Sequence, residues 1–265
     1  MSSVHQTTLK IALAQMDVPA GQPEANLARA REFAAQAREA QADLLLLPEL
    51  WLHGYDLERA AEWAAPLGEG GFAHMAGLAR QFRLHLAGSL LERHAGGVSN
   101  TAVLYAPDGA LLGAYRKVHL FRLMQEPHYL VAGDHATLCP TPWGPTGLAI
   151  CYDLRFPELF RAQVSRGANL FLLPAAFTVT TGRDHWEVLL RARAIENLSY
   201  VVAPAQCGQP VPGRRTYGRS LIIDPWGLIL AQAPDGEGVI LARLDYERLQ
   251  RLRRELPCLR HRRLP

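Results

Sequence analysis

The chain has 265 residues, of which 49% are hydrophobic, with 28 basic and 25 acidic side chains. This length and apolar content fit one α/β domain with a large core. The first ten residues contain no apolar stretch, and the longest later run, 168–179, is interrupted by Pro174, so neither a signal peptide nor a membrane span is predicted. We therefore expect a cytoplasmic protein without membrane contact.

The net charge of +3 is unevenly distributed along the chain. Residues 248–265 hold seven arginines and one acidic residue, Glu255. This segment is too short for a nucleic-acid-binding module, which normally has a basic face across a domain, so we expect it to contact a partner subunit and expect no nucleic acid. The four cysteines form no C-x-x-C pair, so free thiols are predicted, with no disulfide framework, metal or cofactor.

Strand and helix patterns alternate along the chain. Strands are expected at 9–18, 43–49, 84–91, 100–105, 110–118, 147–151, 169–173, 200–205, 220–223, 228–231 and 238–244, and helices at 27–40, 72–82, 157–167 and about 184–199. The last helix is expected to present Arg191 and Arg193 to solvent. The pattern predicts one α/β domain over 1–265, with helices outside and sheets inside, and a basic C-terminal tail from about 245.

The stretch GLAICYDLRFPE at 147–158 contains the first candidate for chemistry. An apolar strand delivers Cys151 into a polar turn, where a rigid element holds the thiol at the edge of a cleft. The backbone N–H groups that follow, starting at Tyr152, are then free to face developing negative charge. The alternative is an inert thiol, because a cysteine among apolar neighbours is most often a small buried hydrophobe.

A carboxylate and an ammonium follow two other predicted strands. Glu49 ends the 43–49 run, and Lys117 is one of only two lysines among the 28 basic residues. Each alone could be a surface charge, but ligands of α/β sheets bind where strands end, so the two could meet Cys151 there. Together they would supply a base, an oxyanion stabiliser and a nucleophile for attack on a carbonyl. A Cys–His pair using His119 or His185 is the rival arrangement.

Three ordered blocks resemble those of the nitrilase superfamily of carbon–nitrogen hydrolases. They are LPE at 47–49, YRKVHLF at 115–121 and ICYDLRFPE at 150–158, and the likeness continues through 185–197 to IDPWG at 223–227. The resemblance implies a four-layer αββα sandwich. It also implies a homodimer or larger homo-oligomer, formed through the helices that follow Cys151 and the PAAF segment, with the C-terminal tail lying across the partner.

The same resemblance implies roles for individual residues. Glu49 would be the general base, Lys117 the oxyanion stabiliser, Cys151 the nucleophile that forms a thioester, and Glu126 a second glutamate that positions the lysine and the substrate. The chain looks most like the omega-amidase and deaminated-glutathione amidase branch, which implies hydrolysis of the terminal amide of a small ω-amido acid, such as 2-oxoglutaramate, to a carboxylate and ammonia. The candidates for contacting this small-molecule amide are Tyr55, Tyr152, Arg155 and Phe177.

One departure from this branch concerns the edge of the expected pocket. Only residues 122–125 separate Phe121 from Glu126, which is shorter than in the typical omega-amidase. Substrate identity therefore stays open, and the same site could act on ureido or nitrile substrates or pass the acyl group to an amine. A non-catalytic binding protein is a remote alternative, and the absence of a G-x-G-x-x-G after the first strand disfavours a dinucleotide-binding enzyme.

Overall fold

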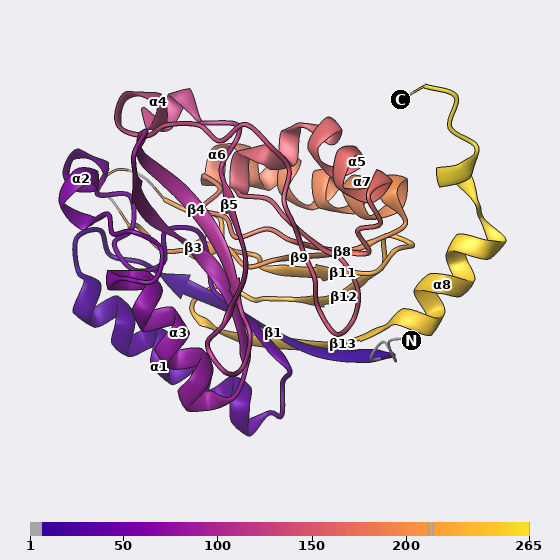
Figure 1. Ribbon diagram of the computed structural model, residues 1–265, viewed down its shortest axis with the longest axis horizontal. Helices are drawn as coiled ribbons and strands as arrows, with labels where there is room; N and C mark the ends of the chain where they lie inside the picture. Colours follow the sequence, from indigo (N-terminus) through magenta and orange to yellow (C-terminus); the bar gives the residue numbers. More distant parts are fainter. Residues whose placement is uncertain (1–6, 211–212, 214, 265) are drawn as a thin grey trace.

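The computed structural model describes residues 7–210, 213 and 215–264, and two β-sheets stack face to face at its centre (Figure 1). In the described chain the first sheet has the order β10-β1-β2-β3-β4-β5, with β13 also pairing β1. Its strands are β1 (Thr8–Asp17), β2 (Leu44–Leu46), β3 (His85–His94), β4 (Gly97–Tyr105), β5 (Leu111–Arg116), β10 (Gln206–Cys207) and β13 (Gly238–Asp245).

The second sheet has the order β12-β11-β9-β8-β7-β6. Its strands are β6 (Leu138–Cys139), β7 (Thr146–Leu148), β8 (Leu170–Leu172), β9 (Tyr200–Ala203), β11 (Leu221–Ile223) and β12 (Ile229–Gln232). Strands β7, β8 and β9 are parallel, so their carboxyl ends share one edge. In the first sheet β5 runs in the same direction as β2, because β2 and β3 are parallel and two antiparallel pairings separate β3 from β5.

Helices cover the outer face of each sheet, and the expected αββα sandwich is confirmed. Against the first sheet lie α1 (Pro23–Glu39) and α3 (Gly70–Phe82), and against the second lie α5 (Pro157–Ser165) and α7 (Glu187–Asn197). Three short helices are α2 (Ala60–Trp63), α4 (Glu126–Tyr129) and α6 (Val179–Thr181), and the C-terminal helix is α8 (Tyr246–Glu255). Among the described residues, no helix combines the length and apolar character needed to cross a membrane.

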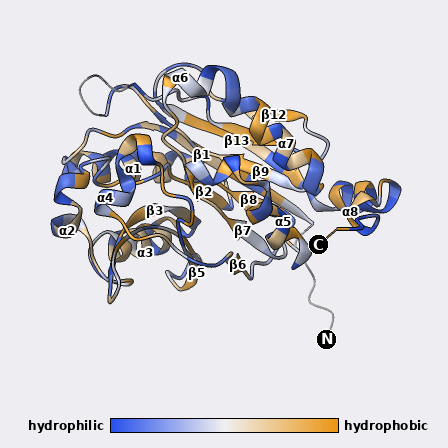
Figure 2. Cartoon of the chain, turned by 90° about the horizontal axis from the view of Figure 1, so that it is seen from above, coloured by the Kyte–Doolittle hydropathy of each residue, from blue (hydrophilic) through white to orange (hydrophobic). Residues whose placement is uncertain are grey.

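Side-chain alternation along the central strands explains the layers. On β1, Ile11 and Leu13 face the core between the two sheets, whereas Ala12 and Ala14 pack with the α1 and α3 side chains on the other face. This period of two is expected for a strand that is covered on both sides. Figure 2 shows the consequence, with hydrophobic residues concentrated on the central strands and hydrophilic ones on the surrounding helices.

Three local expectations were wrong. Helix α1 begins at Pro23 rather than at residue 27, and the Asn26 amide lies inside the helix, donating to the carbonyls of Pro19 and Leu52. The strand expected at 147–151 ends at Leu148, because Cys151 begins a 3₁₀ helix. Arg193 does not face solvent but is buried, where it donates twice to the Leu154 carbonyl.

The basic C-terminal segment begins as helix α8, and Arg248 and Arg253 of this helix have partners within the chain. Arg248 pairs with the buried Asp224 at 3.0 Å. Arg253 donates to the carbonyls of Leu198 and Ala168, so its positive charge lies at the C-terminal end of α7, where a helix favours cations. These two arginines therefore have an intrachain role, and the contact of the tail with a partner subunit stays a prediction.

Candidate active site

Three strand ends bring the predicted reactive groups together between the two sheets. Glu49 follows β2 and Lys117 follows β5, and both strands end at the same edge of the first sheet. Cys151 follows β7 of the second sheet. Stacking the sheets therefore places the thiol opposite the carboxylate and the ammonium, although the three residues lie far apart in sequence.

A buried ammonium between two carboxylates forms the centre of this site. Lys117 Nζ lies 2.8 Å from Glu49 Oε1 and 2.7 Å from Glu126 Oε1, and all three side chains are 0% exposed. The Asn100 amide also donates to Glu49 Oε1, and the Tyr55 hydroxyl donates to Glu126 Oε1. Two of the three ammonium protons are thus committed to carboxylates, which leaves one for a further acceptor.

The backbone around each glutamate is fixed by its own hydrogen bonds. The Gln206 amide donates to the Glu49 carbonyl at 2.7 Å, and the next N–H, that of Leu50, donates to Ser89 Oγ at 3.0 Å. Glu126 Oε2 accepts the N–H of Phe121 at 2.7 Å. The second glutamate therefore closes the short loop that precedes it as well as binding the lysine.

Cys151 adopts an unusual backbone conformation at the start of its 3₁₀ helix. Its φ is +46°, a left-handed value that is uncommon for a residue with a side chain and that is found where the surrounding structure imposes it. Its N–H donates to the Pro174 carbonyl at 3.0 Å. The next N–H, that of Tyr152, donates to no carbonyl of the described residues, as expected for a group that could bind an oxyanion.

The charges around the thiol keep it protonated at rest. Burial raises the pKa of Cys151 well above its usual value, and the Glu49 carboxylate raises it further, while Lys117 acts in the opposite direction. Glu49 Oε2 has no hydrogen bond of standard geometry, yet this carboxylate is close enough to act on the thiol through its charge and a weak hydrogen bond. The thiol therefore needs a base before it can act as a nucleophile.

The ammonium and the two carboxylates shift each other's pKa values. Burial alone would lower the pKa of Lys117, but Glu126 and Glu49 together raise it, so the lysine stays protonated. Burial raises the pKa of Glu126, the charge of Lys117 lowers it, and the neighbouring Glu49 raises it, with a net upward shift. Lys117 thus supplies a permanent positive charge beside the thiol.

A narrow pocket leads to Cys151. Its volume is only about 10 Å³, the space of roughly one water molecule. Its walls are formed by Tyr55, Phe121, Met124, Tyr152, Arg155, Ala176, Phe177, Thr178 and Thr181. A wider hollow of about 450 Å³ lies outside it and shares Phe121, Met124, Thr178 and Thr181. These shared residues form the boundary that a substrate has to pass.

Arg155 is the charged group on the pocket wall. Its guanidinium lies 5.8 Å from the ring centre of Tyr152 and 5.5 Å from that of Phe177, and 3.4 Å from His185 Nδ1. Within the described chain it has no carboxylate partner. An unpaired guanidinium held against aromatic rings is suited to binding a carboxylate of a small ligand.

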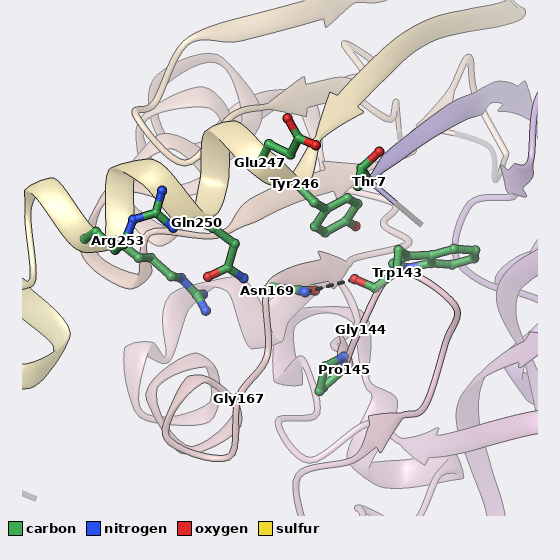
Figure 3. A pocket seen from close by; sticks show the side chains of 11 residues that line it. Thr7, Trp143, Gly144, Pro145, Gly167, Asn169, Tyr246, Glu247, Gln250 and Arg253 are labelled. Carbon is green, nitrogen blue, oxygen red and sulfur yellow. Dashed lines mark hydrogen bonds between the residues drawn. The ribbon is translucent and has the colours of Figure 1, made fainter. Parts of the chain in front are cut away.

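A larger hollow lies elsewhere on the described surface. It has a volume of about 590 Å³, and Figure 3 shows Tyr246, Gln250 and Arg253 of α8 facing Trp143 and Asn169 across it. None of the eight predicted site residues lines this hollow. Volume alone therefore does not identify the reactive site, whereas the cluster of buried charged groups does.

The structure brings all eight predicted site residues into one region. Glu49, Lys117, Glu126 and Cys151 form the buried cluster, and Tyr55, Tyr152, Arg155 and Phe177 line the pocket. The histidines of the rival arrangement have other partners, since His119 Nδ1 lies 2.7 Å from Asp153 Oδ1 and His185 adjoins Arg155.

Sequence reasoning missed several residues of this site. They are Asn100, Gln206, Phe121, Met124, Thr178 and Thr181. The only signal for Asn100 was an amide within a strand otherwise expected to be apolar.

Comparisons with known proteins agree with this arrangement. The carbon–nitrogen hydrolase family model matches residues 10–254, and the chain belongs to that family. It is therefore an enzyme of the carbon–nitrogen hydrolase class. It is 40% identical over 250 residues to the deaminated glutathione amidase of Synechocystis sp., covering 89% of this chain and 92% of that protein.

Two further relatives extend the comparison. The chain is 33% identical over 265 residues to the human omega-amidase NIT2, covering 97% of this chain and 96% of that protein. The crystal structure of Saccharomyces cerevisiae Nit3, a member of branch 10 of the nitrilase superfamily, superimposes with a TM-score of 0.91 at 32% identity, covering 99% of each chain. The expected nitrilase-superfamily membership is thus confirmed.

Substitution can separate the opposing effects of Glu49 and Lys117 on the pKa of the Cys151 thiol. We expect Glu49→Gln to lower the pKa of Cys151, because a negative charge that disfavours the thiolate is removed. We expect Lys117→Met to raise it, because a favourable positive charge is lost. Each shift should be roughly 1–3 units.

The measurement is thiolate absorbance as a function of pH, with a Cys151→Ala variant subtracted to remove the other three thiols. Shifts of the two variants in the same direction would contradict the arrangement of charges described above.

Proposed function

We propose that this enzyme hydrolyses the terminal amide of a small ω-amido acid or ω-amido oxoacid to a carboxylate and ammonia, through a thioester on Cys151. The observation that carries this proposal is the buried contact of a thiol, a carboxylate and an ammonium at the end of one narrow pocket. The names of its relatives, a deaminated glutathione amidase and an omega-amidase, support an amide as the bond that is cleaved.

In the first half of the proposed reaction, Glu49 accepts the thiol proton as the Cys151 sulfur attacks the amide carbon. The negative charge that develops on the carbonyl oxygen is bound by the third proton of Lys117 and by the Tyr152 N–H. The C–N bond then breaks, and the proton held by Glu49 goes to the leaving nitrogen, which departs as ammonia. The acyl group remains on sulfur as a thioester.

In the second half, a water molecule takes the place of ammonia. Glu49 accepts a proton from the water as its oxygen attacks the thioester carbon, and the same two donors bind the oxyanion. The C–S bond breaks, the proton held by Glu49 returns to the sulfur, and the product leaves as a carboxylic acid that loses its remaining proton to solvent to become the carboxylate. Glu126 touches no reacting atom in this sequence; it holds Lys117 at 2.7 Å and keeps it charged.

The proposed substrate class follows from Arg155 and the size of the pocket. An unpaired guanidinium on the wall fits a substrate with a carboxylate at the end opposite to the amide. The pocket next to Cys151 is narrow and has to widen to admit a substrate, which favours a short aliphatic chain between the two groups. Tyr55, Tyr152 and Phe177 would enclose that chain.

We also propose that the protein self-associates through α7 and acts in the cytoplasm. Val188 and Ile195 lie seven residues apart on one face of α7 and are 66% and 47% exposed, and the neighbouring Trp226 and Leu228 are 56% and 58% exposed. The loop of Trp226 contacts this helix, because Arg191 donates to the Gly227 carbonyl. An exposed apolar cluster of this kind fits a subunit interface.

All four cysteines are free thiols, which fits a reducing compartment such as the cytoplasm.

Substitution of the nucleophile and of the oxyanion donor tests the reaction. We expect Cys151→Ala to lower ammonia release by roughly 10⁴-fold or more, because no thioester can form. We expect Lys117→Arg, which keeps the charge but changes donor geometry, to lower kcat by about a hundredfold. The assay measures ammonia from a panel of ω-amido acids, ω-amido oxoacids, ureido compounds and nitriles. Retained turnover by a folded Cys151→Ala protein would refute the proposed mechanism.

Arg155 can be tested by comparing two substrates. For an amide that carries a carboxylate, we expect Arg155→Gln to raise KM roughly 10–100-fold with little change in kcat, because a charge-assisted hydrogen bond is lost. A neutral primary amide of similar length serves as the control, and its kcat/KM should stay nearly constant. An equal loss for both substrates would show that Arg155 does not recognise the carboxylate.

The proposed interface predicts a change in oligomeric state. We expect Val188→Glu and Ile195→Glu to shift the protein towards the monomer in sedimentation or light-scattering measurements, because a charge cannot be buried in an apolar contact. Leu111→Glu places the same charge at a partly exposed leucine on β5 and serves as the control. A wild-type protein that is monomeric at high concentration would exclude this interface.

A further inference from the structure

Asp153 is a buried carboxylate that the proposed reaction does not use. It lies two residues after Cys151 and is 0% exposed. Four donors converge on it: the Ile150 N–H and the Tyr115 hydroxyl bind Oδ2, each at 2.8 Å, and the His119 N–H and ring Nδ1 bind Oδ1, at 3.1 and 2.7 Å. Because an ionised carboxylate only accepts, Nδ1 of His119 is the protonated ring nitrogen in this contact.

These four donors come from both sheets. Ile150 directly precedes Cys151 in the second sheet, whereas Tyr115 and His119 lie two residues before and two residues after Lys117 at the end of β5. The Tyr115 hydroxyl also accepts the N–H of Val118 at 3.2 Å, so the backbone that follows Lys117 is bound twice. One carboxylate therefore connects the segment that carries the thiol to the segment that carries the ammonium.

The Asp153 carboxylate also supports the pocket wall. The His119 ring, oriented by its bond to Asp153, stacks on Phe156 with a centroid distance of 3.7 Å. Phe156 in turn contacts the ring of Tyr152, which lies beside Phe121 at the pocket. Removing the acceptor at position 153 would therefore remove a hydrogen bond that orients these aromatic rings, as well as the bonds that connect the two strand ends.

The left-handed conformation of Cys151 needs such support. A residue with a side chain at φ +46° is held there only when neighbouring bonds over-determine its geometry. Here the bonds are those of the Cys151 N–H to Pro174 and of the preceding N–H, that of Ile150, to Asp153. An asparagine at position 153 would fill the same space but would turn an NH₂ group towards N–H donors.

We propose that Asp153 is a positioning residue that sets the separation of the Cys151 thiol from the Lys117 ammonium across the two sheets. This inference rests on the proposed thioester chemistry, in which both groups act on one carbonyl. Its effect on the reaction is through geometry, since Asp153 touches neither the substrate nor the reacting atoms. A small misplacement of reacting groups costs about a hundredfold in rate.

The first test compares Asp153→Asn with Asp224→Asn. Asp224 is a matched control because it is 1% exposed, lies away from Cys151 and accepts two backbone N–H groups and Arg248. With an amide that the wild type hydrolyses, we expect Asp153→Asn to lower kcat about a hundredfold with KM changed less than threefold, and Asp224→Asn to leave kcat within about twofold. A folded Asp153→Asn protein with wild-type kcat, or equal losses in both variants, would overturn the proposal.

A second measurement does not depend on any substrate. Lys117→Met raises the pKa of the thiol in the wild-type background, and the size of that rise reports how closely the ammonium faces the sulfur. We expect the rise to shrink by at least half when Lys117→Met is made in the Asp153→Asn background. An unchanged rise would overturn the positioning role, even if no amide substrate were found and the proposed function failed.

If Asp153→Asn does not fold, variants that each remove one donor decide the question. Tyr115→Phe deletes only the hydroxyl, and His119→Ala deletes the ring bond and the stack on Phe156. We expect each to lower kcat about three- to tenfold and to reduce the effect of Lys117→Met on the thiol pKa. Wild-type values for both quantities in both variants would overturn the proposal.

Discussion

The structure depends on keeping one ammonium charged in a fully buried site. Lys117 is fully buried, and removing its charge from water would cost several kcal/mol if it were alone. Glu49 and Glu126, at 2.8 and 2.7 Å, offset that cost, and Asn100, Tyr55 and Phe121 donate further hydrogen bonds to the two carboxylates, which leave Glu49 Oε2 without a partner of standard geometry. Burial, together with the charge of Glu49, raises the pKa of the neighbouring thiol, and Glu49 is the carboxylate placed to act as its base.

The two-sheet fold makes this arrangement rigid. Each reactive group lies within three residues of the end of a strand in the two-sheet core, and Glu49, Lys117 and Cys151 are themselves buried, so the core restrains the backbone on which they lie. The thiol belongs to one sheet and the charged groups to the other. Their relative position therefore depends on contacts that cross the interface between the sheets, and the bonds that Asp153 accepts from Tyr115 and His119 are polar contacts of that kind two residues from Cys151.

Much of the site could be predicted because its residues stand where strand patterns stop. Glu49, Lys117 and Cys151 each follow an apolar run, and that pattern is visible in one sequence. The contacts of Asn100 and Gln206 with Glu49 could not be predicted in this way, because both residues lie on other strands. Only the order of the strands in the sheet shows that they are neighbours of Glu49. Arg193 was misplaced because helical spacing does not show that its guanidinium reaches the Leu154 carbonyl. Helix α8 was missed because its arginines suggested a basic tail that contacts a partner subunit, although Leu249 and Leu252 are buried within this chain.

The short loop between Phe121 and Glu126 connects the pocket entrance to the charge cluster through hydrogen bonds. Phe121 forms part of the narrow boundary above Cys151, and its N–H is bound to one oxygen of Glu126 while the other oxygen binds Lys117. The residue whose side chain borders the entrance and the lysine that binds the oxyanion in the proposed reaction are therefore held by opposite oxygens of one carboxylate. A substitution in this segment would disturb substrate access and the position of the ammonium at the same time.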